Sequence, residues 1–579
     1  MAESDAQLVS RRVVWLSFGA IAVAAVAAVV ARGLVALIDF VTNLAFYGRL
    51  SVANVSPAGN HLGLWVILIP VVGGLIVGLM ARFWSQGIRG HGIPEAIERV
   101  LFAESRVPKR LTFLKPLSAA LAIGTGGPFG AEGPIIATGG ALGSLLGQLF
   151  PVTAEERKTL LAAGAAAGMA ATFGTPVASV LLAIELLLFE YRPRSIIPVA
   201  LAAATATAVR VAFVGSAPMF ALEGLTQPRG GALAFYVALG AVTGVAAVWV
   251  TRAVYAAEDL FGRLPIHWMW WPAIGALVVG VIGFFAPRTM GVGYDNIREV
   301  LSGTITGRAL YTLGALKLVS WAVALGSGTS GGTLAPLFTI GGALGAALTA
   351  IAHAAAPGLG VDVRIGALVG MAAIFAGASR ALLASVVFAF EATRQPLGLL
   401  PLLGGCTAAF LVSSLWMKTT IMTEKIVRHG NKVPAEYLAD FLELLYVRDF
   451  VSTPVVALRS DERVDEARAF ISSDAPGARH QGFPVIDEKN ELRGVVTRRN
   501  LLAPEVAGDT PVGEIITRPP TIIFDDDSLR EAAERMAQER IGRLPVVTRK
   551  EPRRVIGMLT RSDILGANRR RLAARRIER

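Results

Sequence analysis

The stretch Gly124–Pro134 (GTGGPFGAEGP) returns in outline as Gly326–Pro336 (GSGTSGGTLAP). Matched positions such as Gly130 and Gly332 lie 202 residues apart, and a GGALG segment follows each copy at the same offset. Glycine lets the backbone approach another group closely, and a helix that starts just after it directs free N–H groups at that group. In a membrane-embedded chain such helix starts are typical of anion sites.

The composition excludes an ordinary soluble protein. Of the 579 residues 53% are hydrophobic and 17% charged, and the mean hydropathy is +0.56. Apolar runs near the length of a spanning helix occur at Val13–Ala31, Leu62–Met80, Ala232–Val250, Trp271–Phe285 and Leu397–Trp416. Arg11 and Arg12 precede the first run, so we expect a multi-pass protein of the cell membrane with cytoplasmic N- and C-termini.

The net charge of +12 does not indicate nucleic-acid binding. Much of the positive charge lies at expected cytoplasmic edges and in the tail Arg569–Arg579, where membrane orientation and anionic lipid explain it. The single cysteine, Cys406, forms no intrachain disulfide and excludes metal sites built from cysteine clusters.

The duplication extends beyond the opening motif. Gly168–Phe173 matches Gly370–Phe375 at the same offset of 202, and Ala178–Glu185 matches Ala384–Glu391 at 206. Chance similarity between helices rich in small residues does not explain several blocks at one offset. An internal repeat with interrupted helices is typical of membrane transport proteins.

The chain changes character after the last apolar run. Phe483–Ile486 matches Leu544–Val547 at an offset of 61, Asp527–Arg540 has helical periodicity, and Arg554–Leu559 is predicted to be a strand. This predicts a tandem of small α+β units. The expected domains are a membrane domain over 1–425, a linker over 426–446, soluble units over 447–505 and 511–567, and a basic tail over 568–579.

Three glycine-rich breaks precede apolar helices, at Gly90–Pro94, Gly130–Pro134 and Gly332–Pro336. Proline suits the first turn of a helix because the N–H that it lacks has no partner there. Each break therefore predicts a buried helix N-terminus with unpaired N–H groups and a positive dipole end. Several such ends that converge would hold a dehydrated anion weakly enough to release it.

Glu132 is the single acid within these breaks, and its matched position is Leu334. A carboxylate within the membrane is costly and marks a functional site. Beside helix N–H groups it could occupy the anion site and be displaced by an anion or by protonation. The alternative is a glutamate that only stabilises the start of its own helix.

The three motifs resemble GSGIP, GxEGP and GxFxP of the CLC family of chloride channels and proton/chloride exchangers, and the soluble end resembles that family's paired CBS domains. The resemblance implies an all-α polytopic membrane domain with an inverted internal repeat and broken helices, followed by an α+β tandem CBS domain. It also implies a homodimer in the lipid bilayer with a pore in each subunit. Glu132 matches the gating glutamate. The anion-binding positions are His91, Gly92, Ile93, Ala131, Gly133, Thr333, Leu334 and Met422.

Three departures from the family pattern concern the site. His91 stands where the family has serine, and Met422 stands where it has the pore tyrosine, which implies a weaker or wider inner gate. The exchangers carry a second glutamate after the one matched by Glu185, whereas this chain has Leu186. Glu185 and Glu190 are the substitutes for proton transfer.

In the CBS pair, Thr497, Thr560 and Asp563 match the family's nucleotide-binding pattern, although Asn500 replaces the first aspartate. The CBS pair could bind an adenine nucleotide, or it could be a structural module that binds nothing. No cofactor is expected to be required.

The sequence favours transport of chloride or similar monovalent anions, with a lean toward channel-like uncoupled conduction. The alternative is a proton/chloride antiporter, in which protons are a second substrate. A remoter one is a CBS-regulated cation transporter, although the scattered acids of the membrane part do not suit a hard cation. No nucleophile–base pair or metal-ligand spacing favours an enzyme.

Overall fold

The computed structural model describes residues 11–433, 441–452 and 454–576, with side chains up to 570. The chain separates into two compact units, Met1–Gly430 and Asn431–Arg579. The first is helical and the second contains two small sheets. The predicted fold classes of both parts are therefore confirmed.

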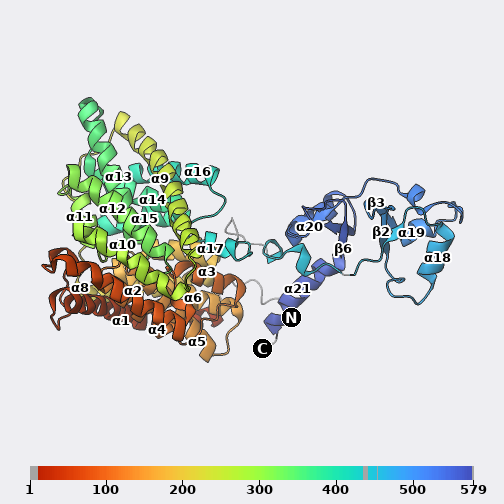
Figure 1. The fold of residues 1–579 in the computed structure, drawn as a ribbon, viewed down its shortest axis with the longest axis horizontal. Helices are drawn as coiled ribbons and strands as arrows, with labels where there is room; N and C mark the ends of the chain where they lie inside the picture. Colours follow the sequence, from red (N-terminus) through yellow and green to blue (C-terminus); the bar gives the residue numbers. More distant parts are fainter. Residues whose placement is uncertain (1–10, 434–440, 453, 577–579) are drawn as a thin grey trace. The chain divides into compact units, whose positions relative to one another are not determined.

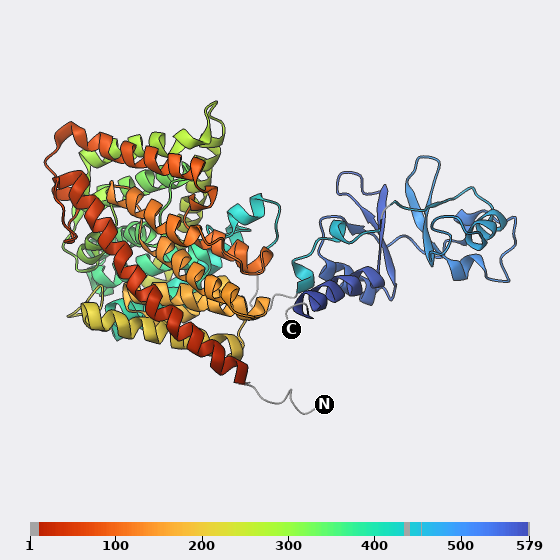
Figure 2. The same ribbon diagram turned by 90° about the horizontal axis from the view of Figure 1, so that it is seen from below.

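The first half of the helical unit begins with a long helix. Its helices are α1 (Arg11–Tyr47), α2 (Leu68–Phe83), α3 (Ile93–Phe102), α4 (Leu111–Gly124), α5 (Glu132–Leu149), α6 (Ala154–Phe173), α7 (Pro176–Ala183) and α8 (Pro193–Val214). At 1.5 Å per residue the 37 residues of α1 extend about 55 Å. This exceeds the thickness of the hydrocarbon core, so α1 is long enough to span it even when tilted. Figure 2 shows α1 running along the unit.

The second half repeats this order. Its helices are α9 (Gly231–Gly262), α10 (Trp271–Phe285), α11 (Tyr294–Leu301), α12 (Gly307–Gly326), α13 (Leu334–Ala355), α14 (Val363–Ser379), α15 (Leu382–Thr393), α16 (Leu399–Trp416) and α17 (Glu424–Arg428). In Figure 1, α1, α2, α4 and α5 lie together in one part of the unit, and α9, α12, α13 and α16 lie in another.

Among the described residues, eight helices are long and apolar enough to span a membrane. Each apolar run singled out in the sequence coincides with one of them. α3 and α11 are short, and α7 is interrupted by a π-helical turn over Ile184–Leu188. The prediction of spanning helices mixed with broken ones is confirmed.

The two halves pack by the same pattern. α5 packs on α6 as α13 packs on α14, and α1 packs on α8 as α9 packs on α16. Across the halves, α2 contacts α10, α7 contacts α15 and α5 contacts α13, so each helix meets its own counterpart. These pairs between counterparts are expected where two copies are related by a local two-fold axis.

The repeated GGALG segment brings helices together backbone to backbone. A Cβ at Gly139 on α5 would meet the carbonyl oxygen of Gly164 on α6 at 2.2 Å. The matched Gly341 on α13 would meet that of Gly370 on α14 at 2.4 Å. Glycine is therefore required for this close helix packing, as is common in membranes.

The glycines matched across the repeat pair with each other. Gly332 N donates to Gly130 O at 2.8 Å and Gly130 N donates to Gly332 O at 3.3 Å, in an isolated antiparallel bridge. Equivalent residues that exchange both hydrogen bonds in antiparallel sense lie on a local two-fold axis. The two halves are therefore inverted relative to each other.

Each of two matched glutamates caps a helix in the opposite half of the repeat. Glu185 accepts hydrogen bonds from Leu383 N and Ala384 N, both at 3.0 Å, at the start of α15. Glu391 accepts from Val177 N at 3.1 Å and Ala178 N at 2.8 Å, at the start of α7. Each carboxylate satisfies helix N–H groups that have no intrahelical partner.

The second unit contains two copies of one small fold. The first consists of β1 (Leu458–Arg459), α18 (Val464–Ser472), β2 (Gly482–Ile486), β3 (Leu492–Thr497) and α19 (Arg498–Leu501); the second of β4 (Ile523–Phe524), α20 (Leu529–Gln538), β5 (Arg543–Val547), β6 (Val555–Thr560) and α21 (Arg561–Arg576). In each sheet the central strand pairs parallel with the first strand and antiparallel with the third. The predicted strand–helix repeat is confirmed.

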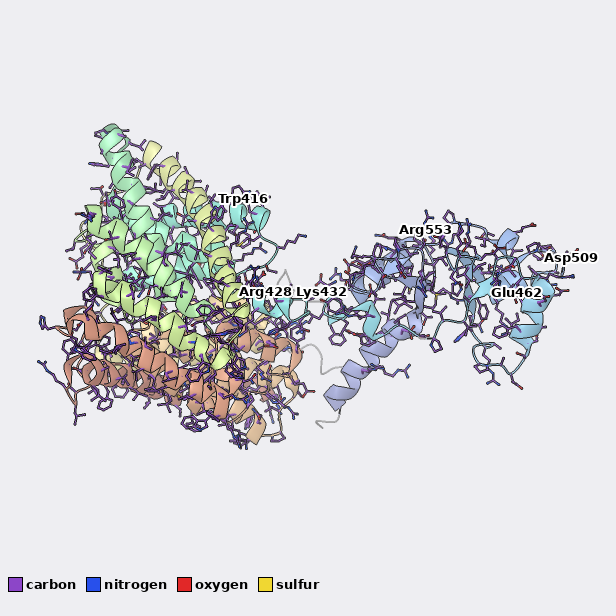
Figure 3. All side chains as sticks on the ribbon, viewed as in Figure 1. Trp416, Arg428, Lys432, Glu462, Asp509 and Arg553 are labelled. Carbon is purple, nitrogen blue, oxygen red and sulfur yellow. The ribbon has the colours of Figure 1, made fainter. Side chains whose placement is uncertain are left out.

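The boundary between the units lies later than the expected residue 425. α17 belongs to the first unit, which extends to Gly430. Lys425 forms an ion pair with Glu95 at 2.7 Å, and Arg428, labelled in Figure 3, pairs with Asp259 on α9. These contacts attach to the membrane unit a segment that composition had assigned to the linker.

We expect Glu391→Ala to lower the stability of the helical unit, because it leaves two amides at the start of α7 without their charged acceptor. Loss of hydrogen bonds to a charged group costs about 1–3 kcal/mol. The measurement is thermal unfolding in detergent. Glu185→Ala should have a similar effect. Glu223→Ala, which removes an exposed carboxylate, is the control. Unfolding of Glu391→Ala at the same temperature as this control would contradict the capping role.

Candidate anion site

Glu132 is the first residue of α5 and is fully buried. Its Oε1 accepts a hydrogen bond from the Tyr294 hydroxyl at 2.8 Å. The carboxylate also interacts with its own backbone N–H and with that of Ala335 in the first turn of α13. Oε2 is buried without a hydrogen-bond partner. A carboxyl group therefore lies between the N-termini of α5 and α13.

Glycines leave the space that this carboxylate fills. A Cβ at Gly130 would meet Glu132 Oε2 at 1.7 Å, and one at Gly332 would meet Gly130 O at 2.5 Å and the same Oε2 at 2.9 Å. A Cβ at Gly133 would meet His91 O at 2.3 Å. The backbones of all three predicted breaks therefore converge around one carboxylate.

The first amide at the start of α3 donates its hydrogen bond to a side chain of the protein. Gly92 precedes the helix at φ +90°, a value that favours glycine, and its N–H donates to Glu95 Oε2 at 2.8 Å. In this structure the Gly92 amide therefore has an acceptor within the protein, and its predicted role in anion binding stays a prediction. Glu95 is held in place by Lys425. Ile93, the first residue of α3, is buried.

His91 and Met422 lie at the same place. The His91 imidazole is buried and interacts with the backbone of Ile421, and its Nδ1 has no hydrogen-bond partner. Met422 follows Ile421 and is fully buried. The residues that match the family serine and tyrosine are thus brought together, as the resemblance implies.

At the start of α13, Thr333 and Leu334 are fully buried. The Thr333 Oγ1 has no hydrogen-bond partner. At the start of α5, Ala131 is buried and precedes Glu132 in a helical conformation. A buried hydroxyl without a partner indicates a position that a polar or ionic ligand would complete.

The two acids predicted as proton carriers have other partners. Glu185 caps α15, as described above. Glu190 accepts a hydrogen bond from Ser195 Oγ at 2.6 Å and lies 3.6 Å from Arg192. Glu190 therefore stabilises the start of α8.

The sequence missed two buried lysines that hold the breaks in shape. Lys115 Nζ donates to the carbonyls of Ile88 and Gly90, both at 2.9 Å. Lys317, 202 residues later, donates to Thr289 O at 2.9 Å and Gly291 O at 3.0 Å. The repeat offset contained this signal, because both lysines lie at matched positions in mainly apolar helices.

Tyr294 was also missed as a site residue. In the sequence, Gly90–Ile93 aligns with Gly291–Tyr294 at an offset of 201, which places Tyr294 opposite Ile93 but indicates no role for it. Its contact with Glu132 joins residues 162 positions apart, which the repeat alone does not reveal.

Two cavities approach the site. One of about 300 Å³ is lined by Ala131 and Tyr294 together with Arg32, Arg210 and Arg298. The other, of about 320 Å³, is lined by residues that include His91, Arg89, Lys425 and Glu258. Arginine and lysine side chains in both walls favour the approach of anions.

The predicted nucleotide residues serve as helix caps. Asp563 Oδ2 accepts from Thr560 N at 2.8 Å and from Thr560 Oγ1 at 2.7 Å. Asn500 accepts equivalently from Thr497. A nucleotide at this pair remains a proposal. In residues 11–433, 441–452 and 454–576 no group of three or more His, Cys, Asp or Glu side chains is placed to hold a metal ion.

Comparison with known proteins agrees with this geometry. Residues 73–414 match the voltage gated chloride channel family, and residues 447–504 and 512–570 match CBS domains. The chain therefore belongs to the CLC family of anion transport proteins and carries a CBS pair.

Individual relatives extend the comparison. The H(+)/Cl(-) exchange transporter ClcA of Vibrio parahaemolyticus is 30% identical over 62% of this chain and 79% of its own length. A solved cyanobacterial Cl⁻/H⁺ antiporter, described as slow, matches 72% of this chain and 97% of its own with a TM-score of 0.65 and 23% identity. A eukaryotic CLC transporter matches 95% of this chain and 97% of its own, with a TM-score of 0.61 and 19% identity. At these identities the two structures show the fold alone.

We expect Gly332→Ala to destabilise the site, because the new methyl group would meet backbone at Gly130 and the Glu132 carboxylate. Backbone atoms cannot yield as a flexible side chain does, so the Gly130–Gly332 bridge should break. The measurement is the melting temperature and the yield of monodisperse protein in detergent. Gly33→Ala on α1, where nothing lies within 4 Å of the added atom, is the matched control. Equal behaviour of the two variants would refute the close approach.

Proposed function

We propose that this protein moves chloride or a similar monovalent anion across a membrane through the site between α3, α5 and α13, and that Glu132 is its gate. One observation carries the proposal: the Glu132 carboxylate lies buried between the N-termini of α5 and α13. A position that accepts a carboxylate offers N–H donors and dipole ends to any small anion of similar charge.

Competition between the carboxylate and the anion would then control passage. While Glu132 occupies the site, it blocks the path between the two cavities. An arriving anion, or a proton on the carboxylate, releases it. Because N–H groups and dipole ends supply less than a full positive charge, the anion is bound weakly enough to leave.

His91 would act on the opposite side of the site from Tyr294. It lines the second cavity, and its imidazole can present a donor to an anion as the serine hydroxyl of the family pattern would. Met422 next to it offers no hydroxyl. We therefore expect the barrier on this side to be weaker than one closed by a tyrosine.

Two mechanisms are compatible with this gate. Uncoupled conduction is favoured because Glu185 and Glu190 both stabilise helix starts, and Leu186 stands where the exchangers carry their second glutamate. Proton-coupled exchange is favoured by the intact Glu132 and by the Vibrio relative, which is named as an exchanger. We propose uncoupled conduction first and exchange second.

Anion flux from proteoliposomes tests the proposal. Purified protein should release chloride from loaded vesicles down its gradient, and protein-free vesicles should not. Absence of chloride flux from vesicles that contain folded protein would overturn the proposed function.

We expect Glu132→Gln to make chloride flux independent of pH, because the carboxamide cannot be charged and no longer alternates between blocking and release. The same vesicles, measured with a pH electrode under a chloride gradient, separate the two mechanisms. Uphill proton movement that the native protein drives and that disappears in Glu132→Gln would establish exchange. Chloride flux without any uphill proton movement would establish uncoupled conduction. Glu223→Gln is the control. Native pH dependence in Glu132→Gln would exclude Glu132 as the gate.

A further inference from the structure

Tyr294 contacts the proposed gate directly. It is the first residue of α11, and its hydroxyl donates to Glu132 Oε1 at 2.8 Å. Its counterpart in the first half is Ile93, just as the counterpart of Glu132 in the second half is Leu334. Each half therefore supplies one member of a polar pair. At the position that matches each member, the opposite half has an apolar residue.

The phenol is held by contacts that do not involve Glu132. Its ring makes edge-on contacts with Phe173, at a centroid distance of 5.8 Å, and with Phe220, at 6.4 Å. The loop before it is fixed by Lys317, which donates to the carbonyl of Gly291. Edge-on aromatic pairs of this kind favour a defined ring orientation. The hydroxyl is thus placed in advance for the carboxylate.

Tyr294 also forms part of a cavity wall. Together with Ala131, the residue before Glu132, it lines the cavity of about 300 Å³. Three arginines, Arg32, Arg210 and Arg298, line the same cavity together with Asp39 and Asp295. The phenol therefore stands between this cavity, whose wall carries more positive than negative side chains, and the buried carboxylate. Tyr294 and the N-cap residue of α5, Ala131, therefore lie side by side in the wall of this cavity.

We propose that Tyr294 is a positioning residue that latches the Glu132 carboxylate in the anion site and so weakens chloride binding there. This rests on the proposed function. A hydrogen bond to a charged carboxylate is roughly twice as strong as one between neutral groups. An anion that displaces Glu132 must also break this bond. Without the hydroxyl, the carboxylate leaves the site more readily and chloride competes better.

Chloride binding to purified protein, measured by isothermal titration calorimetry, tests the latch in a double-mutant cycle. Tyr294→Phe keeps the ring and its contacts with Phe173 and Phe220 but removes the donor. Glu132→Ala removes the acceptor; glutamine is unsuitable because its carboxamide oxygen still accepts. The four proteins are the native chain, both single variants and the double variant.

We expect Tyr294→Phe to bind chloride about 10- to 150-fold more tightly than the native chain, in line with the loss of one hydrogen bond to a charged group. In the Glu132→Ala background the same substitution should change affinity by less than about twofold, because no carboxylate remains to be latched.

The other outcomes separate the latch from the function on which it rests. Unchanged or weaker binding by Tyr294→Phe would overturn the latch, and so would an equal change in both backgrounds, which indicates that the phenol acts through packing. If the double variant binds chloride with the same affinity as Glu132→Ala alone, the Tyr294→Phe substitution leaves the protein folded. If neither the native chain nor Glu132→Ala binds chloride, the proposed function itself fails and the latch with it.

Discussion

The reciprocal hydrogen bonds between Gly130 and Gly332 are the contact on which the site depends. They bring two equivalent points of an inverted repeat to hydrogen-bonding distance, which only residues without a side chain permit at this place. α5 and α13 begin just beyond the bridge, so their N-termini meet at the local axis. A site for negative charge follows from the symmetry of the backbone before any charged side chain is considered.

The residues to which we assign the proposed function lie at positions where the two copies of the repeat differ. The lysines at 115 and 317 keep both breaks in shape and preserve the symmetry. Glu132 and Tyr294 depart from it, each facing an apolar counterpart. The symmetric frame thus brings two helix N-termini together, and one asymmetric pair lies between them. A carboxylate is accommodated there at low cost, because the N–H groups of the helix starts stabilise negative charge.

Much of this could be predicted from the sequence, because a repeat records which residues share an environment. Glycine-rich breaks that precede apolar helices predicted the three helix starts, and hydropathy predicted the spans. The use of the Gly92 amide by Glu95, and the contact of Tyr294 with Glu132, could not be predicted. Both depend on the direction of a side chain across elements far apart in sequence, which periodicity does not encode.

Glu185 and Glu391 each cap a helix in the opposite half, so the two halves depend on each other during synthesis of the chain. The amides at the start of α7 find their acceptor 214 residues further along the chain. Until that residue emerges, the amides of Val177 and Ala178 lack the charged acceptor that they have in the complete fold. Each half therefore lacks one helix cap until the other half is present. The duplicated halves, although each resembles an independent module, mature as one cooperative unit whose assembly finishes only when the second copy has been inserted.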